Sequence, residues 1–326
     1  MSLQITKRSR RLRSSESLRN MIAETSLTAD HFIVPLFISE GKNIKDPILS
    51  MPGYFRLSLD KLKDEVAELT SLGLHSVLLF VKVPDEKKDN EGHEALNPDG
   101  LMQRAIRYIK ELAPEMLVFT DVALDPYSSY GHDGIVANQK IMNDPSVEVL
   151  AKMAVSHAQA GADFVAPSDM MDGRVKAIRQ ALDGAGFADT GILSYSAKYA
   201  SGFYGPFRDA LDSAPGFGDK KTYQMDFRNS IEALKEVDLD IEEGADIVMV
   251  KPAGAYLDII RSVKNHVQVP VAAYQVSGEY AMIKAAAANG WLDEKQVMVE
   301  SLMAIRRAGA DVIATYFAKD FVRLKI

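Results

Sequence analysis

The stretch DIVMVKPAGAYLDII, residues 246–260, shows the pattern on which the fold prediction rests. Its apolar, largely β-branched start is typical of a strand buried in a parallel sheet. Lys251 follows at once, although an ammonium without a partner is costly to bury. Similar apolar runs recur along the chain. With this one they number eight, at residues 31–37, 76–81, 117–124, 163–168, 191–196, 246–251, 271–276 and 311–317.

Between these runs lie segments with helical periodicity, such as 58–73, 98–114 and 146–162. Strands that alternate with amphipathic helices predict parallel βα units. Eight units predict a closed (β/α)8 TIM barrel, with an open doubly wound sheet as the alternative. No G-x-G-x-x-G follows the first strand to favour that alternative. We expect an N-terminal arm over residues 1–30 and a barrel catalytic domain over 31–326.

Composition excludes several classes of protein. The 326 residues are 47% hydrophobic and 25% charged, and the net charge of −7 gives no reason to expect a nucleic-acid partner. No apolar run approaches the ~18 residues typical of a membrane span. The start of the chain is basic and polar, without the apolar core of a secretory signal, which predicts a cytoplasmic protein. The absence of cysteine excludes disulfides, thiol nucleophiles and thiolate metal sites.

Two lysines follow neighbouring predicted strands. Lys251 ends the sixth strand and Lys198 lies just beyond the fifth, and adjacent strands are about 4.8 Å apart. Burial and a nearby like charge both lower a lysine pKa, and a lysine so shifted forms Schiff bases with ketones. The alternative is that each lysine simply reaches solvent. The long, Gly- and aromatic-rich connection 197–225 favours an active site, because it is typical of a lid.

Four motifs carry a resemblance to a known family. They are VAPSDMMDGRV (165–175), SAKYASGFYGPFRDA (196–210), DIVMVKPAGAYLDII (246–260) and YQVSGEYAM (274–282). With them the sequence resembles the 5-aminolevulinate dehydratase (porphobilinogen synthase) family over residues 31–326. The resemblance implies condensation of two 5-aminolevulinate molecules to porphobilinogen, an early step of haem and chlorophyll (tetrapyrrole) synthesis. It also implies that Lys251 forms the Schiff base with the first substrate and that Lys198 engages the second.

The resemblance assigns further residues to the substrate carboxylates. For the second substrate they are Arg208 and Lys220, with Gln224 nearby, and for the first they are Ser277 and Tyr316. Without the family, Ser277 is typical of a helix N-cap and Tyr316 of a packed aromatic residue. We expect Ser168 and Asp169 to hydrogen-bond around the lysines. The lid aromatics Phe203, Tyr204 and Phe207 are expected to exclude water, which protects an imine from hydrolysis.

The stretch FTDVALDPYSSYGHDG, residues 119–134, is rich in aspartate. Many family members hold a catalytic zinc with three cysteines at the positions of Ala123, Asp125 and Asp133. The resemblance therefore implies the zinc-independent, magnesium-responsive branch. Asp121, Asp125 and Asp133 would line the second-substrate side. There Asp125 and Asp133 would orient the amino group of that substrate or hold a monovalent or divalent ion loosely, although Asp125 before proline is also a common turn initiator. We expect His132 to be a loop residue rather than a zinc ligand.

The resemblance places an allosteric Mg²⁺ on Glu236, away from the catalytic site. By its helical spacing alone Glu236 is a solvated charge. Hard cations such as Mg²⁺ suit carboxylate ligands of this kind.

Residues 5–20 contain six basic side chains and one acid, Glu16. The basic residues are Lys7, Arg8, Arg10, Arg11, Arg13 and Arg19. Such a segment is typical of a nucleic-acid arm. The resemblance instead implies an arm that wraps a neighbouring subunit and builds dimers into a homo-octamer, without a nucleic-acid partner. Two rival functions stay open at this point: another Schiff-base barrel, such as a class I aldolase, and a non-catalytic barrel that binds nucleic acid through its arm.

Overall fold

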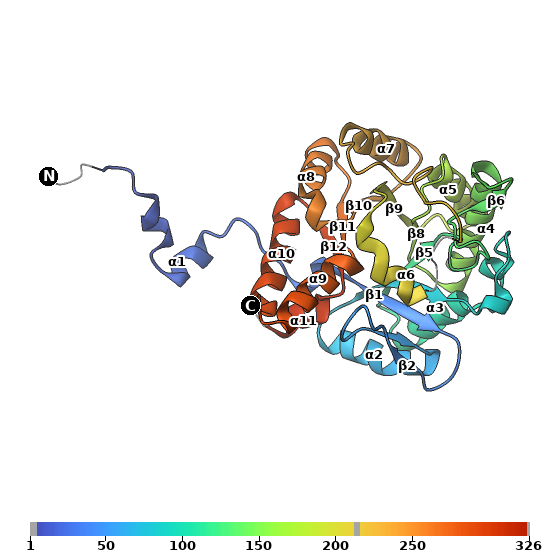
Figure 1. Cartoon of the computed structure of the whole chain (residues 1–326), viewed down its shortest axis with the longest axis horizontal. Helices are drawn as coiled ribbons and strands as arrows, with labels where there is room; N and C mark the ends of the chain where they lie inside the picture. Colours follow the sequence, from blue (N-terminus) through green and yellow to red (C-terminus); the bar gives the residue numbers. More distant parts are fainter. Residues whose placement is uncertain (1–4, 212–215, 325–326) are drawn as a thin grey trace.

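Eight parallel strands form a closed barrel in the computed structural model, which describes residues 5–211 and 216–324. The strands are β1 (Phe32–Ser39), β4 (Ser76–Lys82), β5 (Leu117–Val122), β8 (Phe164–Pro167), β9 (Gly191–Lys198), β10 (Ile247–Lys251), β11 (Val271–Gln275) and β12 (Val312–Thr315). Each strand pairs with the next, and β12 pairs with β1 (Figure 1). The predicted (β/α)8 barrel is confirmed, and closure excludes the open sheet.

An outer ring of helices surrounds the strands (Figure 1). It comprises α2 (Leu59–Ser71), α3 (Leu101–Leu112), α4 (Asn143–Ala160), α5 (Arg174–Gly184), α7 (Ile231–Glu242), α8 (Leu257–His266), α9 (Ser277–Ala288), α10 (Glu294–Ala308) and α11 (Ala318–Arg323). Apolar stripes on these helices face the barrel; α2, for example, buries Leu62, Val66 and Leu69 at helical spacing. In β4, by contrast, five consecutive residues are buried, as expected for a strand covered on both faces.

Short elements occupy the connections, and the sequence analysis did not predict them. Strands β2 (Lys45–Pro47) and β3 (Phe55–Leu57) extend the sheet beside β1, and β6 (Ile135–Ala137) and β7 (Lys140–Met142) form a hairpin. The remaining short helices are η3 (Asp85–Lys87), η4 (His93–Leu96), η5 (Gly202–Tyr204), α6 (Gly205–Leu211) and η6 (Gly254–Tyr256). The predicted lid contains η5 and α6, and its residues 212–215 lie outside the described part of the chain.

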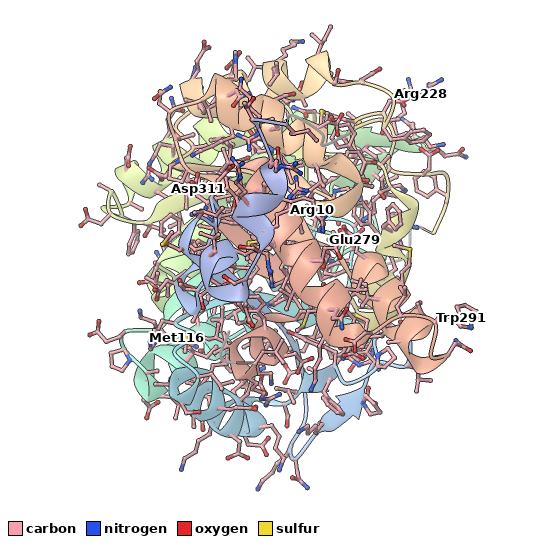
Figure 2. The ribbon with its side chains drawn as sticks, turned by 90° about the vertical axis from the view of Figure 1, so that its left-hand side faces the viewer. Arg10, Met116, Arg228, Glu279, Trp291 and Asp311 are labelled. Atoms are coloured by element: carbon pink, nitrogen blue, oxygen red, sulfur yellow. The ribbon has the colours of Figure 1, made fainter. Side chains whose placement is uncertain are left out.

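The arm extends away from the barrel (Figure 1), and in Figure 2 it passes in front of the barrel with Arg10 on it. It contains η1 (Ser9–Arg13) and α1 (Glu16–Met21), and η2 (Ala29–His31) leads into β1. From residue 5 to residue 24 every side chain except Leu18 is exposed, and Leu27 is the first buried one. Residues 1–4 of the predicted arm lie outside the described residues. A role in subunit contacts stays a prediction.

A β-bulge in β9 determines which residues face the barrel interior. Val248 of β10 pairs with Ser194, but Val250 pairs with Ala197, so β9 has one extra residue between them. In a regular strand, residues three apart point to opposite faces. Here the ring of Tyr195 and the amine of Lys198 lie together inside the barrel, whereas Ser194 contacts the outer helices.

No helix in the described ranges is both long and apolar enough to cross a membrane.

Candidate active site

The two predicted lysines lie side by side at the mouth of the barrel. Lys251 and Lys198 are direct register partners on β10 and β9, and each is only 6% exposed. Four aromatic rings surround the Lys251 amine. Their centroids lie 4.7 Å (Tyr274), 5.0 Å (Tyr195), 5.1 Å (Phe207) and 5.2 Å (Tyr204) from Nζ. Phe207 and Tyr204 come from the lid, as predicted, whereas Tyr195 and Tyr274 were missed.

The surroundings of Lys251 favour its neutral amine. Burial, and then the charge of Lys198, lower its pKa to about 7, although nearby carboxylates, Asp121 foremost, oppose the shift. A neutral amine in a water-poor cage is the form that attacks a ketone carbonyl. The geometry therefore supports imine chemistry at Lys251.

Lys198 is held from two sides. Its Nζ donates a hydrogen bond to the backbone carbonyl of Ser168, at the end of β8, and lies 3.9 Å from Oδ2 of Asp133.

Burial and then the charge of Asp125 raise the pKa of Asp121 to about 7, although a hydrogen bond from Ser168 opposes this shift. A carboxyl with such a pKa can give or accept a proton near neutral pH.

The ammonium of Lys220 lies between two aspartates of the 119–134 stretch. Its Nζ is 2.8 Å from Oδ1 of Asp133 and 3.3 Å from Oδ2 of Asp125. Burial lowers the pKa of Lys220, but the two carboxylates outweigh burial and raise it. Burial raises the pKa of Asp133, but Lys220 and then Lys198 outweigh it and lower that pKa. Burial keeps the pKa of Asp125 raised. The Lys220 ammonium from the lid thus supplies one positive charge to both carboxylates.

Two of the predicted carboxylate-binding residues, Ser277 and Tyr316, contact aromatic residues of the Lys251 cage. The Ser277 hydroxyl accepts a hydrogen bond of 2.9 Å from the backbone N–H of Phe207, and the Tyr316 and Tyr274 hydroxyls are 2.9 Å apart. Arg208 is half-buried, and within the described residues its guanidinium has no hydrogen-bond or ion-pair partner. Gln224 is buried, 4% exposed, and lines the cavity beside Glu236.

Glu236 lies apart from the lysines, on α7 outside the barrel. It lines a cavity of about 270 Å³ together with Asp172, Glu232 and the lid residues 221–225. Burial and then Asp240 raise the pKa of Glu236. The cavity thus combines carboxylates with a half-buried position, which suits a hard cation.

A buried ion-pair network, not foreseen from the sequence, joins α7 to the barrel. The guanidinium of Arg174 donates to both carboxylate oxygens of Asp240, at 2.8 and 3.2 Å. Ser194 donates to the same carboxylate at 2.6 Å, and Arg174 Nε lies 3.8 Å from Asp169. Burial raises the pKa of Asp169 to about 6. The network fixes α7 against the ends of β8 and β9.

The contacts of His132 agree with its predicted role, and a second histidine lies beside two carboxylates. The two ring nitrogens of His132 contact the Tyr223 hydroxyl at 3.1 Å and the Phe217 carbonyl at 3.0 Å, as suits the predicted loop residue. A second histidine, His93, forms a metal-capable surface group with Asp89 and Glu91, whose ligand atoms lie within 4.8 Å of one another. The sequence analysis missed this group because its spacing matches no common motif.

The family profile described as Delta-aminolevulinic acid dehydratase matches residues 6–324 of the chain. The chain belongs to the delta-aminolevulinic acid dehydratase family. A dehydratase of Halalkalibacterium halodurans is 54% identical over 97% of this chain and 96% of its own length. The chloroplastic dehydratase of Physcomitrium patens is 59% identical over 95% of this chain and 72% of its own length. The structure of the Toxoplasma gondii dehydratase was solved with the reaction product porphobilinogen, and it matches this chain with a TM-score of 0.97 at 52% sequence identity. The match covers 99% of this chain and 92% of the Toxoplasma gondii chain.

The family fixes the reaction. The dehydratase is a lyase that condenses two molecules of 5-aminolevulinate into porphobilinogen for tetrapyrrole biosynthesis. The alternatives of a class I aldolase and of a non-catalytic barrel were therefore wrong.

Proposed function

We propose that Lys251 is the nucleophile of this condensation. Its neutral amine adds to the ketone carbon of the first 5-aminolevulinate, and loss of water from the resulting carbinolamine gives the Schiff base. The observation that carries this role is the ring cage of Lys251, which removes water and lowers its pKa to about 7. Closure of the lid rings would also protect the imine from hydrolysis.

The second substrate lies, in this proposal, between Lys198 and the aspartates. Lys198 engages its ketone, and Asp121 exchanges protons because its pKa is about 7. Arg208, Lys220 and Gln224 bind its carboxylate. An ammonium has three donors, and Lys220 uses two of them on Asp125 and Asp133, so one stays available for substrate.

Ser277 and Tyr316 bind the carboxylate of the first substrate. The Ser277 oxygen accepts a hydrogen bond from the lid, which leaves its own O–H proton free to donate. The hydroxyl pair of Tyr316 and Tyr274 uses one proton between its two oxygens and leaves the other free. Two donors therefore point to a site for a carboxylate beside the Lys251 cage.

Borohydride trapping with 5-aminolevulinate, followed by peptide mapping, tests the proposal. We expect a reduced adduct on the peptide that contains Lys251. The initial trapping rate should rise with pH through about 7, because protonation below its pKa removes the nucleophile. An adduct confined to another lysine, or a rate independent of pH between 6 and 8, would contradict the role of Lys251.

Mg²⁺ is proposed as an allosteric ion on Glu236, with no catalytic zinc. The cavity beside Glu236 offers Asp172 and Glu232 as further oxygen donors, which fits a hard cation. When bound, the ion would supply positive charge between α7 and the lid. Against zinc at the catalytic centre stand the lack of cysteine and the Lys220 ammonium between Asp125 and Asp133.

Glu236→Gln should weaken Mg²⁺ binding, measured by titration calorimetry, at least about tenfold, because a direct carboxylate ligand is lost. Stimulation of activity by Mg²⁺ should shift to higher concentration in parallel. Glu242→Gln, an exposed position on the same helix, is the matched control. Equal affinities in the two variants would remove Glu236 from the ion site.

The arm is proposed to hold subunits together in a homo-octamer built from dimers. Exposed apolar side chains support this role, since Leu12 is 56% and Met21 76% exposed next to the basic residues. Deletion of residues 1–20 should lower the particle mass measured by light scattering, and retention of the full mass would contradict the proposal.

We expect the arm not to bind DNA at low salt. A cytoplasmic location, to be checked by cell fractionation, also stays a prediction.

A further inference from the structure

Glu279 is a buried carboxylate that the roles above do not use. It lies in the first turn of α9, is 7% exposed, and forms no ion pair with any residue that the structure describes. In Figure 2 Glu279 lies over the body of the barrel, whereas Trp291, just beyond the other end of α9, lies at the outer edge. Burial raises the pKa of Glu279 to about 7, although three backbone hydrogen bonds oppose the shift.

These hydrogen bonds come from two different segments. Oε1 accepts from the N–H of Gly254 at 2.6 Å, and Oε2 accepts from the N–H of Val276 at 2.7 Å and, more weakly, from that of Ala253 at 3.4 Å. Gly254 and Ala253 belong to the turn that directly follows Lys251, whereas Val276 lies between the neighbouring strand β11 and α9. The carboxylate therefore ties the Lys251 turn to the start of α9.

The first turn of α9 also holds the lid. Ser277 accepts the hydrogen bond from Phe207, whose ring lies 5.1 Å from the Lys251 amine. Gly278 packs so closely on the lid that a Cβ there would lie 2.4 Å from the carbonyl oxygen of Phe203. The lid and the turn after Lys251 thus rest on consecutive residues of one helix.

We propose that Glu279 is a positioning residue that fixes Lys251 relative to the lid rings. The inference rests on the proposed role of Lys251 as nucleophile. It adds that the amine is aimed by a carboxylate which does not touch substrate, acting through the turn 252–254. Misplacement of a reacting group by about 1 Å can cost ~10²-fold in rate, so loss of this tie should appear in catalysis.

Glutamine cannot replace Glu279, because both oxygens are needed as acceptors. Whichever way the amide is oriented, its NH₂ faces a backbone N–H, and one of the two ties breaks while the size of the side chain is kept. Gly254→Ala disrupts the same hydrogen bond at its donor residue, since the new Cβ would lie 2.4 Å from Oε1 of Glu279. Glu300→Gln, at an exposed position of α10, makes the same chemical change as a control.

The test compares the wild type with these three variants and with the double variant Glu279→Gln/Gly254→Ala. Glu279→Gln should lower kcat at least about tenfold with KM changed less than about threefold, and Gly254→Ala should have the same signature. In both, the pH at which trapping of Lys251 is half-maximal should move upward, because a displaced ammonium regains water and ordinary lysine pKa values are higher. The effects of the double variant should be less than additive, because both changes break one contact. Glu300→Gln should match wild type.

Three outcomes would overturn the inference, and they differ. If the wild-type adduct maps away from Lys251, the proposed nucleophile fails and this inference with it. If the wild-type adduct is on Lys251 but both variants keep wild-type kcat and trapping profiles, the inference alone fails. A loss of activity that only follows the unfolded fraction, measured by circular dichroism, with an unchanged pH profile would show a merely structural role. Gly254→Ala decides the matter if Glu279→Gln does not fold.

Discussion

Lys251→Met is expected to reduce kcat by a factor on the order of 10³ or more, because it removes the nucleophile and leaves the rest of the pocket in place. Methionine has nearly the same length, and its thioether packs well against the four rings around Nζ. The change also removes the desolvation cost of a buried ammonium, so the melting temperature should not fall. Porphobilinogen formation and thermal unfolding measure the two effects.

Lys235→Met, at an exposed position of α7, controls for the loss of one charge and should retain wild-type activity. A Lys251→Met enzyme within tenfold of wild type would show that another group carries the covalent step. A strongly lowered melting temperature would mean that the ammonium stabilises the barrel mouth, contrary to the environment seen around it.

Lys220→Met is expected to have the largest effect on stability. It leaves the carboxylates of Asp125 and Asp133 buried without their shared partner, and breaking a buried pair in this way costs about 3–5 kcal/mol. Activity should fall as well, because the substitution removes a proposed carboxylate donor. Lys221→Met is the matched control. Its side chain is 69% exposed and, among the residues that the structure describes, pairs only with exposed Asp219, so about 0–1 kcal/mol is expected.

The stability difference between wild type and Lys220→Met should depend on pH. Lys220 helps to hold the pKa of Asp133 below its ordinary value of 3.8. Such a carboxylate stabilises the fold above its unfolded pKa, and the contribution disappears as pH falls through the folded value. The difference in denaturation free energy should therefore be present at pH 7 and shrink toward pH 3. Equal stability of the Lys220 and Lys221 variants at pH 7 would contradict the buried pairing.

The barrel could be predicted from the sequence because each strand is a continuous apolar run between helices. The runs at 246–251 and 191–196 also placed two lysines on neighbouring strands, and the register of β9 and β10 confirms that adjacency. The pairs β2–β3 and β6–β7 were missed because three-residue strands carry no readable periodicity. Their pairing depends on the connections into which they fold.

The detailed contacts of the site could not be predicted from the sequence, for two physical reasons. Tyr195 and Lys198 are three residues apart, so a regular strand would separate them, and only the bulge in β9 brings them together. The second reason is distance along the chain. Lys220 meets Asp133 across 87 residues, and Arg174 meets Asp240 across 66. No local sequence pattern predicts which of these distant residues form ion pairs. The motif containing Glu279 was interpreted only as a family signature. The hydrogen bond from Gly254 to Glu279 is visible only in the folded structure.

The position of Lys220 also determines how the aspartate loop obtains its counter-charge. A tethered cation has an effective concentration set by the chain and not by the solution. The pair Asp125 and Asp133 therefore shares one fixed positive charge, and a chelator that strips ions from the surroundings cannot withdraw it. A loop that binds its counter-ion from solution would lose that ion when trace metals are scarce. This loop has its counter-charge from the moment the chain folds.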